Sequence, residues 1–351
     1  MKSKRGAASV GRAVDLVRLA EIVEQFSGKK IVMYGDFVAD EFLYGDISRV
    51  SREAPVLILK HRETKLVPGG GANATNNLAA LGAKVLPVTT VGNDAAGEAL
   101  VEYFHGLGVD TSGIVRVANW TTPTKTRFLA GWAHTTAQQV LRVDREPDVP
   151  VPDKAKARVA PKLAAKLRSA QALAISDYGF GNAAPQEVKR ALRKAKGKIP
   201  VTLDVRHGLT RYSGCGVAFA TPNEAELEAV HQTTIGKNVD ELERCGGKTL
   251  ISMKLESLLV TRGRDGMALF ERDGKRLTQI PVHGSDQAVD VTGAGDTVLA
   301  AFTLALASGA SSLEAAHVAN IAGGLVVMKR GTATVTQAEL LETIRRESSG
   351  S

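Results

Sequence analysis

A glycine-rich stretch bounded by two aspartates is the strongest candidate for chemistry in this chain. Residues 289–297 read Val-Asp-Val-Thr-Gly-Ala-Gly-Asp-Thr, and an apolar helical pattern runs from about Asp296 to Ala307. We therefore expect Gly293, Ala294 and Gly295 at a helix N-terminus, where unpaired backbone N–H groups and the helix dipole attract anions. Asp296 would lie in the first turn of the same helix.

An anion site beside a carboxylate is what phosphoryl transfer requires. The amides stabilise charge on the moving phosphoryl group, and the carboxylate orients and deprotonates the attacking hydroxyl. An aspartate at a helix start also has a purely structural explanation, because the dipole stabilises it there. The glycines next to Asp296 favour the catalytic interpretation.

A second glycine-rich motif, Pro-Gly-Gly-Gly-Ala-Asn-Ala at 68–74, lies more than 200 positions earlier. Together the two motifs resemble those of the PfkB/ribokinase family of carbohydrate kinases. The resemblance implies an ATP-dependent sugar kinase with Asp296 as the catalytic base. It also implies that Gly69, Gly70, Gly71 and Asn73 line the sugar site.

The resemblance assigns further residues. Asp40 would accept hydroxyls of the sugar. Asn223 and Glu226 would act on Mg²⁺ through water, although Asn followed by Glu three residues later is also a helix capping box. The expected ATP-binding residues are Asn223, Glu226, Thr261, Gly263, Thr292, Asn320 and Gly323. A monovalent cation, K⁺, would lie near Asp290, Thr292 and Thr334.

One branch of the family resembles the chain most. Residues 44–56, Tyr-Gly-Asp-Ile-Ser-Arg-Val-Ser-Arg-Glu-Ala-Pro-Val, are similar to the kinase domain of bacterial heptose-7-phosphate kinases, which implies transfer to the anomeric hydroxyl. A sugar that already carries a phosphate needs cations to bind it. The residues expected to bind the substrate, besides those above, are Arg49, Arg52, Lys125, Arg127, Arg206 and Asp177.

Two departures from that branch leave the sugar open. Arg206 stands where a lysine is expected, and Gly179-Phe180-Gly181 replaces a small-basic pair. A kinase for ribose, fructose, a fructose phosphate or a nucleoside remains an alternative. A non-catalytic protein of this fold that senses sugar or nucleotide is another.

Short β-rich runs alternate with helical patterns along the chain. Several runs are continuously apolar, as in strands buried on both faces. This predicts an α/β fold with a doubly wound, mainly parallel sheet and helices on both faces. The family resemblance implies that this fold is ribokinase-like. The expected strands are 31–34, 85–91, 172–175, 201–204, 217–220 and 258–261, and the expected helices include 72–81, 95–107 and 185–196.

Segments 42–65 and 121–145 contain β-forming residues without a helical pattern. We expect them to form a small β lid, with a hairpin turn at 131–134; the alternative is that they are edge strands of the main sheet. Exposed lid strands favour a homodimer through the lid. Residues 1–29 are expected to form an N-terminal extension with a helix, 30–345 the kinase domain and 346–351 a tail.

Bulk properties exclude several classes of protein. The net charge of +8 suits anionic ligands, and no nucleic-acid motif accompanies it, so the expected partners are ATP and a sugar or sugar phosphate. Cys215 and Cys245 form no metal-binding pattern, which excludes a zinc or disulfide framework. No apolar run reaches the roughly 20 residues that span a bilayer. We therefore expect a cytoplasmic enzyme.

Overall fold

The structure is a computed structural model, and it describes residues 9–10, 14–132, 137–195, 198–272, 277–285 and 287–350. The expected turn at 131–134 lies partly outside these residues, and so does much of the expected N-terminal extension. Among the described residues, no helix is both long and apolar enough to cross a membrane.

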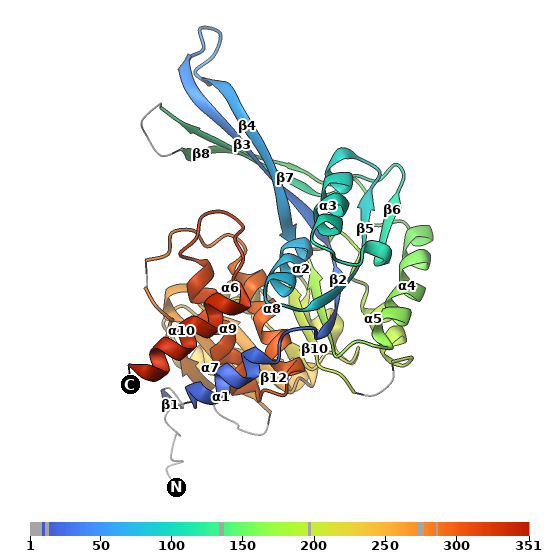
Figure 1. Cartoon of the computed structure of the whole chain (residues 1–351), viewed down its shortest axis with the longest axis vertical. Coiled ribbons are helices and arrows are strands. Elements are labelled where there is room, and N and C mark those ends of the chain that lie inside the picture. The colour runs from blue at the N-terminus through green and yellow to red at the C-terminus, as the bar shows by residue number, and fades with distance from the viewer. Residues whose placement is uncertain are drawn as a thin grey trace.

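A 10-stranded sheet forms the centre of the molecule (Figure 1). All its neighbouring strands pair in parallel except those on either side of β13. The inner strands are buried along most of their length, which explains their continuously apolar sequences. In the order in which they lie across the sheet, the strands are β1 (Ser9–Val10), β14 (Leu277–Ile280), β13 (Met267–Glu271), β12 (Ser257–Thr261), β11 (Phe219–Ala220), β10 (Val201–Val205), β9 (Ala172–Asp177), β2 (Lys30–Gly35), β5 (Lys84–Gly92) and β6 (Ile114–Val117).

Helices cover both faces of this sheet, as expected. One large apolar cluster includes side chains of α1, α2, α8, α9 and α10, and a second includes side chains of α4, α5, α6 and α7. Helix α8 is buried on all sides from Asp296 to Leu306, so its start is held rigidly inside the protein. The helices are α1 (Leu16–Glu24), α2 (Gly71–Ala80), α3 (Ala95–Gly106), α4 (Asp153–Leu167), α5 (Pro185–Leu192), α6 (Glu224–His231), α7 (Val239–Met253), α8 (Ala294–Ala307), α9 (Ser312–Val326) and α10 (Gln337–Ser349).

The two β-rich segments lie in a separate four-stranded sheet, not at the edge of the main sheet. Its order is β4 (Leu57–Gly70), β3 (Phe37–Val50), β7 (Thr124–Gly131) and β8 (Gln138–Arg145). The β3–β4 hairpin rises out of the body of the molecule, and its tip lies far from the helices (Figure 1). The β7 and β8 strands are antiparallel, as the sequence predicted.

Two details differ from the expectations. Strand β13 runs antiparallel inside the otherwise parallel sheet, which the chain achieves with a short return after β12. Helix α10 continues to Ser349, into the segment expected to be a tail, because its Thr336–Glu339 capping box and buried Leu340 and Ile344 hold it against the core.

The chain changes direction at the centre of the sheet. It moves outward from β2 to β5 on one side and later from β9 to β10 on the other, with β2 and β9 adjacent. Ligands of open α/β sheets bind at the carboxyl ends of the strands at such a switch point. Asp36 follows β2, and Tyr178 follows β9, so both lie at this position.

Candidate active site

Asp296 lies in the first turn of α8 with its side chain buried. The amide nitrogen of Asn73 donates to its Oδ2 at 2.8 Å, and the hydroxyl of Tyr178 donates to its Oδ1 at 3.3 Å. Burial raises the pKa of Asp296 to about 7, against the hydrogen bond from Asn73, which lowers it. A base with a pKa near the working pH is well suited to proton transfer from a hydroxyl.

The glycine at position 293 is required by its surroundings. Gly293 has φ +77°, and a Cβ there would stand 2.4 Å from Nδ2 of Asn73. The left-handed backbone turns the chain into α8 and leaves the first N–H groups of the helix without an intrahelical partner. The two predicted motifs, at 68–74 and 290–296, therefore meet through Asn73.

Asp40 lies on β3 with an exposure of 4%. Arg127 on β7 donates to its Oδ1 at 2.6 Å and also covers the ring of Phe42. Burial raises the pKa of Asp40, and the charge of Arg127 opposes that rise. Oδ2 is directed toward the glycine motif, because a Cβ on Gly69 would lie 2.6 Å from it.

Gly69→Ala is expected to raise KM for the sugar by about 10-fold or more, because the new methyl group displaces the carboxylate of Asp40 from its position. The KM for ATP should stay unchanged, since the nucleotide residues lie elsewhere. Initial rates with each substrate varied in turn measure both constants. A Gly69→Ala enzyme with the wild-type sugar KM would show that Asp40 does not hold the sugar.

Two further cations lie near this site. Lys125 on β7 and Arg206 after β10 form no direct salt bridge with a described residue. Burial lowers the pKa of Lys125, the charge of Asp40 opposes that change, and the neighbouring charge of Arg206 lowers the pKa further. The ammonium of Lys125 lies over the ring of Tyr178 at 5.1 Å. Cations without a direct salt bridge are suited to bind an anion.

Arg49 and Arg52 do not belong to this cluster. Both are exposed near the tip of the β3–β4 hairpin (Figure 1). Arg49 and Asp40 lie on the same strand, and at about 3.3 Å per residue they are roughly 30 Å apart. The structure therefore does not bring Arg49 and Arg52 together with Asp40, and their predicted role in substrate binding stays a prediction.

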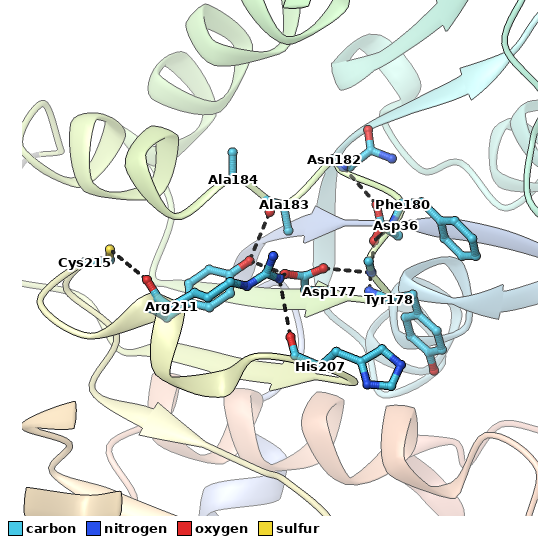
Figure 2. Close-up of polar contacts among 12 residues, drawn as sticks. Asp36, Asp177, Tyr178, Phe180, Asn182, Ala183, Ala184, His207, Arg211 and Cys215 are labelled. Carbon is cyan, nitrogen blue, oxygen red and sulfur yellow. Dashed lines mark hydrogen bonds and ion pairs between the residues drawn. The ribbon is translucent and has the colours of Figure 1, made fainter. Parts of the chain in front are cut away.

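Asp177 is also absent from the open site. Its side chain is 2% exposed and both oxygens are engaged, Oδ1 by the Gly179 N–H at 2.9 Å and Oδ2 by Arg211 at 2.9 Å and Tyr212 at 2.7 Å. Figure 2 shows Asp177 between Arg211 on one side and the loop that begins at Tyr178 on the other. Since both oxygens already accept hydrogen bonds inside the protein, the structure does not bring Asp177 together with the residues around Asp40, and its substrate role stays a prediction.

A cavity of about 540 Å³ lies on the other side of the α8 N-terminus. It is large enough for a nucleotide, and apolar side chains such as Val282, Val291 and Val298 form much of its wall. Of the predicted ATP residues, Thr261, Gly263, Asn320 and Gly323 line it, together with Ala294 and Gly295. Thr292 does not line it, since its backbone N–H bonds to Asp290.

Asn223 and Glu226 form the capping box of α6. The N–H of Glu226 donates to Asn223 Oδ1 at 2.8 Å, and the N–H of Asn223 donates to Glu226 Oε2 at 2.9 Å. Burial raises the pKa of Glu226, whereas the bond from Asn223 and the charge of Arg206 oppose that rise. The structural interpretation of this motif is confirmed, and one oxygen of Glu226 remains available.

The loop around Asp290 receives two backbone donors. Thr292 N–H bonds to its Oδ1 and Gly331 N–H to its Oδ2, each at 2.9 Å. These bonds lower the pKa of Asp290 although burial opposes them. The carbonyl of Thr334 accepts the ammonium of Lys329 at 2.7 Å. Because the ammonium of Lys329 already binds the carbonyl oxygen of Thr334, this oxygen does not fit the predicted K⁺ site.

The geometry combines a buried carboxylate at a helix start, a nucleotide-sized cavity beside it and a group of polar and cationic side chains around Asp40. The family of pfkB carbohydrate kinases matches residues 29–339 of this chain. The chain belongs to the pfkB family of carbohydrate kinases. It is accordingly an ATP-dependent sugar kinase, and the family implies use of a divalent metal.

Curated relatives agree with this assignment. "Bifunctional protein HldE" of Pelobacter propionicus is 36% identical over 333 residues, which cover 94% of this kinase and 66% of the relative. The protein of the same name from Geobacter metallireducens is 38% identical over 312 residues, covering 88% of this kinase and 62% of the relative. This pfkB-family kinase therefore spans 62% to 66% of the length of these relatives.

A solved structure confirms the ribokinase-like fold. Arabidopsis thaliana ribokinase, solved with ribose and ATP, superposes with a TM-score of 0.68 at 20% identity, covering 91% of this kinase and 99% of the ribokinase chain. This likeness concerns the fold of the pfkB-family kinase.

The structure adds a carboxylate that we did not predict from the sequence of this pfkB-family kinase. Asp204 is the next-to-last residue of β10 and lies near Glu226 and Asp296. Burial raises the pKa of Asp204 well above the usual value, and the charges of Glu226 and Asp296 raise it further. Among the described residues no group of three or more His, Cys, Asp or Glu side chains forms a ready metal site. Asp204 and Glu226 still fit a divalent cation, because an added positive charge would keep both ionised.

Proposed function

We propose that this kinase transfers the γ-phosphoryl group of ATP to the anomeric hydroxyl of heptose 7-phosphate. The observation that carries the proposal is the pair of cations near Asp40, Lys125 and Arg206, which form no direct salt bridge with a described residue and lie close enough to lower the pKa of Lys125. An unphosphorylated sugar gives these cations no partner, whereas a sugar phosphate does. The likeness of residues 44–56 to heptose-7-phosphate kinases supports the same substrate.

In the proposed reaction, Asp296 accepts the proton of the acceptor hydroxyl. The sugar oxygen forms a bond to the γ-phosphorus, the bond from that phosphorus to the bridging oxygen of ATP breaks, and ADP leaves. The N–H groups at Gly293 and Gly295 would face the charge that develops on the phosphoryl oxygens, whereas the N–H of Ala294 donates to the carbonyl of Val291 at 3.2 Å. Asn73 holds the carboxylate of Asp296 in position during this step.

Glu226 and Asp204 would hold Mg²⁺, Glu226 through a water molecule. The ion supplies positive charge to the phosphates of ATP when it is bound. Asn223 would contribute through its backbone N–H, which donates to the carboxylate of Glu226 and orients it, while the Asn223 side chain caps α6.

A panel of acceptors tests the proposal. ADP release is measured with heptose 7-phosphate, the unphosphorylated heptose, fructose 6-phosphate, ribose and adenosine. We expect kcat/KM for heptose 7-phosphate to exceed that for the unphosphorylated heptose by at least about 100-fold, because two cations contact the phosphate. A higher value for any unphosphorylated sugar would refute the phosphosugar proposal and leave the kinase assignment intact.

Lys125→Met should raise KM for heptose 7-phosphate by about 10-fold or more and leave KM for ATP within about 2-fold, because a charged hydrogen bond to phosphate is lost. Lys65→Met provides a matched control: Lys65 is also a lid lysine over a tyrosine ring, Tyr44, and its salt bridge is to Glu63. Equal effects of both substitutions on the sugar KM would mean that Lys125 acts only on lid stability.

We further propose a cytoplasmic homodimer joined through the lids. Lid residues Val50, Leu57, Val140, Leu141 and Val143 are large, apolar and exposed, which favours a protein partner. Both cysteines are free and buried, which suits a reducing compartment. Light scattering of wild type and Leu141→Glu tests the lid contact: the variant should be monomeric, and an unchanged dimer would place the interface elsewhere.

A further inference from the structure

Tyr178 occupies a position that the reaction described above does not use. Its hydroxyl donates to Oδ1 of Asp296, and its ring carries the ammonium of Lys125 at 5.1 Å. One side chain thus touches both the base and the cation assigned to the sugar phosphate. The ring also packs against the glycine motif at 68–74, since a Cβ on Gly70 would lie 3.1 Å from Cε2 of Tyr178.

The loop that carries Tyr178 is fixed by the buried carboxylate of Asp36. Three backbone N–H groups donate to it: Tyr178 at 2.9 Å and Phe180 at 3.0 Å to Oδ2, and Asn182 at 3.0 Å to Oδ1 (Figure 2). Asp36 is fully buried and directly follows β2. A carboxylate that accepts three main-chain donors determines the path of the loop between them.

A second carboxylate holds the start of the same loop. The carboxylate of Asp177 accepts hydrogen bonds from Arg211, Tyr212 and the N–H of Gly179. Gly179 and Gly181 adopt φ values of +90° and +96°. These glycines permit the sharp course that brings the amides of three alternate residues, 178, 180 and 182, onto Asp36 while the Tyr178 hydroxyl bonds to Asp296 on α8.

The hydroxyl of Tyr178 stays a donor at working pH. Burial raises its pKa well above the usual value, and the charges of Asp296 and Asp204 raise it further. The bond to Asp296 therefore stabilises the ionised carboxylate in one orientation. Asn73 holds the other oxygen, so the base is held from two sides.

We propose that Tyr178 is a positioning residue that orients the carboxylate of Asp296 toward the acceptor hydroxyl and holds Lys125 over the sugar cleft, and that Asp36 acts through Tyr178. The proposal rests on Asp296 being the base, whichever sugar is the substrate. The groups that face Asp296 are Asn73 on α2, Asp40 on β3, Lys125 on β7, Tyr178 after β9 and Asp204 on β10.

The test begins with Tyr178→Phe, which keeps the ring over Lys125 and removes only the hydroxyl. We expect kcat to fall about 10-fold, with KM for ATP unchanged, because the base loses one of its two donors. The acid limb of the pH–rate profile should move to higher pH by at least about 0.5 unit, since a bond to the ionised carboxylate is lost.

Tyr212→Phe is the matched control. It removes a buried hydroxyl that bonds to Asp177 and to the carbonyl of Ala183 and does not touch Asp296. It should lower the melting temperature and leave the acid limb where it is in wild type. A displacement of the limb in both variants would attribute the effect to loss of structure and overturn the proposal.

A double-mutant cycle with Asp36→Asn tests the second part. The asparagine amide cannot accept all three amides, so the Tyr178 loop should loosen and kcat should fall. In the Tyr178→Phe background the same substitution should cost at least about 3-fold less in kcat than in wild type. Equal costs in both backgrounds would refute the link from Asp36 through Tyr178.

The turnover of Asp296→Asn shows whether a failed prediction concerns the role of Tyr178 or the role of Asp296 as the base. An inactive Asp296→Asn enzyme combined with a wild-type kcat and pH profile for Tyr178→Phe would reject the role of Tyr178 alone. An active Asp296→Asn enzyme would reject the base instead.

Discussion

Asp296→Asn is expected to lower kcat by a factor on the order of 10² to 10⁴, with KM for ATP unchanged within about 2-fold. The amide has nearly the same shape and keeps a contact to Asn73, but it cannot accept the proton of the acceptor hydroxyl. Single-turnover measurements with saturating ATP and sugar separate this step from product release.

Asp153→Asn controls for the structural explanation of a carboxylate at a helix start. Asp153 lies in the first turn of α4, and its side chain is almost fully exposed, with no place in the active site. Its substitution should leave kcat at the wild-type value. Near-normal turnover in Asp296→Asn would show that Asp296, like Asp153, serves only its helix.

Gly293→Ala is expected to lower kcat by at least about 10², because the methyl group would collide with Asn73, the residue that holds the base. The left-handed backbone at position 293 adds strain of about 1–2 kcal/mol for any residue with a side chain. The α8 N–H groups that face the phosphoryl group would then shift. Steady-state rates and thermal unfolding of the purified variant measure the two effects.

Gly309→Ala matches the backbone strain without the collision. Gly309 follows the other end of α8 with φ +86°, and nothing lies within 4 Å of the position a Cβ would take. It should destabilise the protein to a similar degree with little change in kcat. Similar kcat values for the two variants would mean that strain, and not the contact with Asn73, determines the effect of Gly293→Ala.

Local motifs were sufficient to predict the centre of the site. Asp296, Gly293 and Asn73 meet because each motif begins a helix, and a helix start is recognisable from neighbouring residues. Asp40 was predictable for a related reason, since it follows the first core strand. The doubly wound α/β sheet followed from the alternation of apolar strands and helices, and its ribokinase-like form from the resemblance of the two glycine-rich motifs to the family.

Residues whose roles depend on distance could not be assigned in the same way. Arg49 stands near Asp40 in sequence, yet an extended strand separates them by roughly 30 Å. Asp177 adjoins the sugar cleft, but strand alternation turns it into the interior. Asp204 and Tyr178 gain their partners from other strands, and one sequence gives no signal of such pairings beyond their position at strand ends.

The pH dependence of single-turnover phosphoryl transfer, in wild type and in Asp296→Asn, tests the role of the buried base most directly. Burial raises the pKa of Asp296 to about 7, and only the ionised form accepts a proton. The wild-type rate should therefore fall tenfold per unit as the pH drops below about 7, and the residual rate of Asp296→Asn should lack this limb. A wild-type rate that is flat from about pH 5 to 8, or an identical acid limb in Asp296→Asn, would contradict the account.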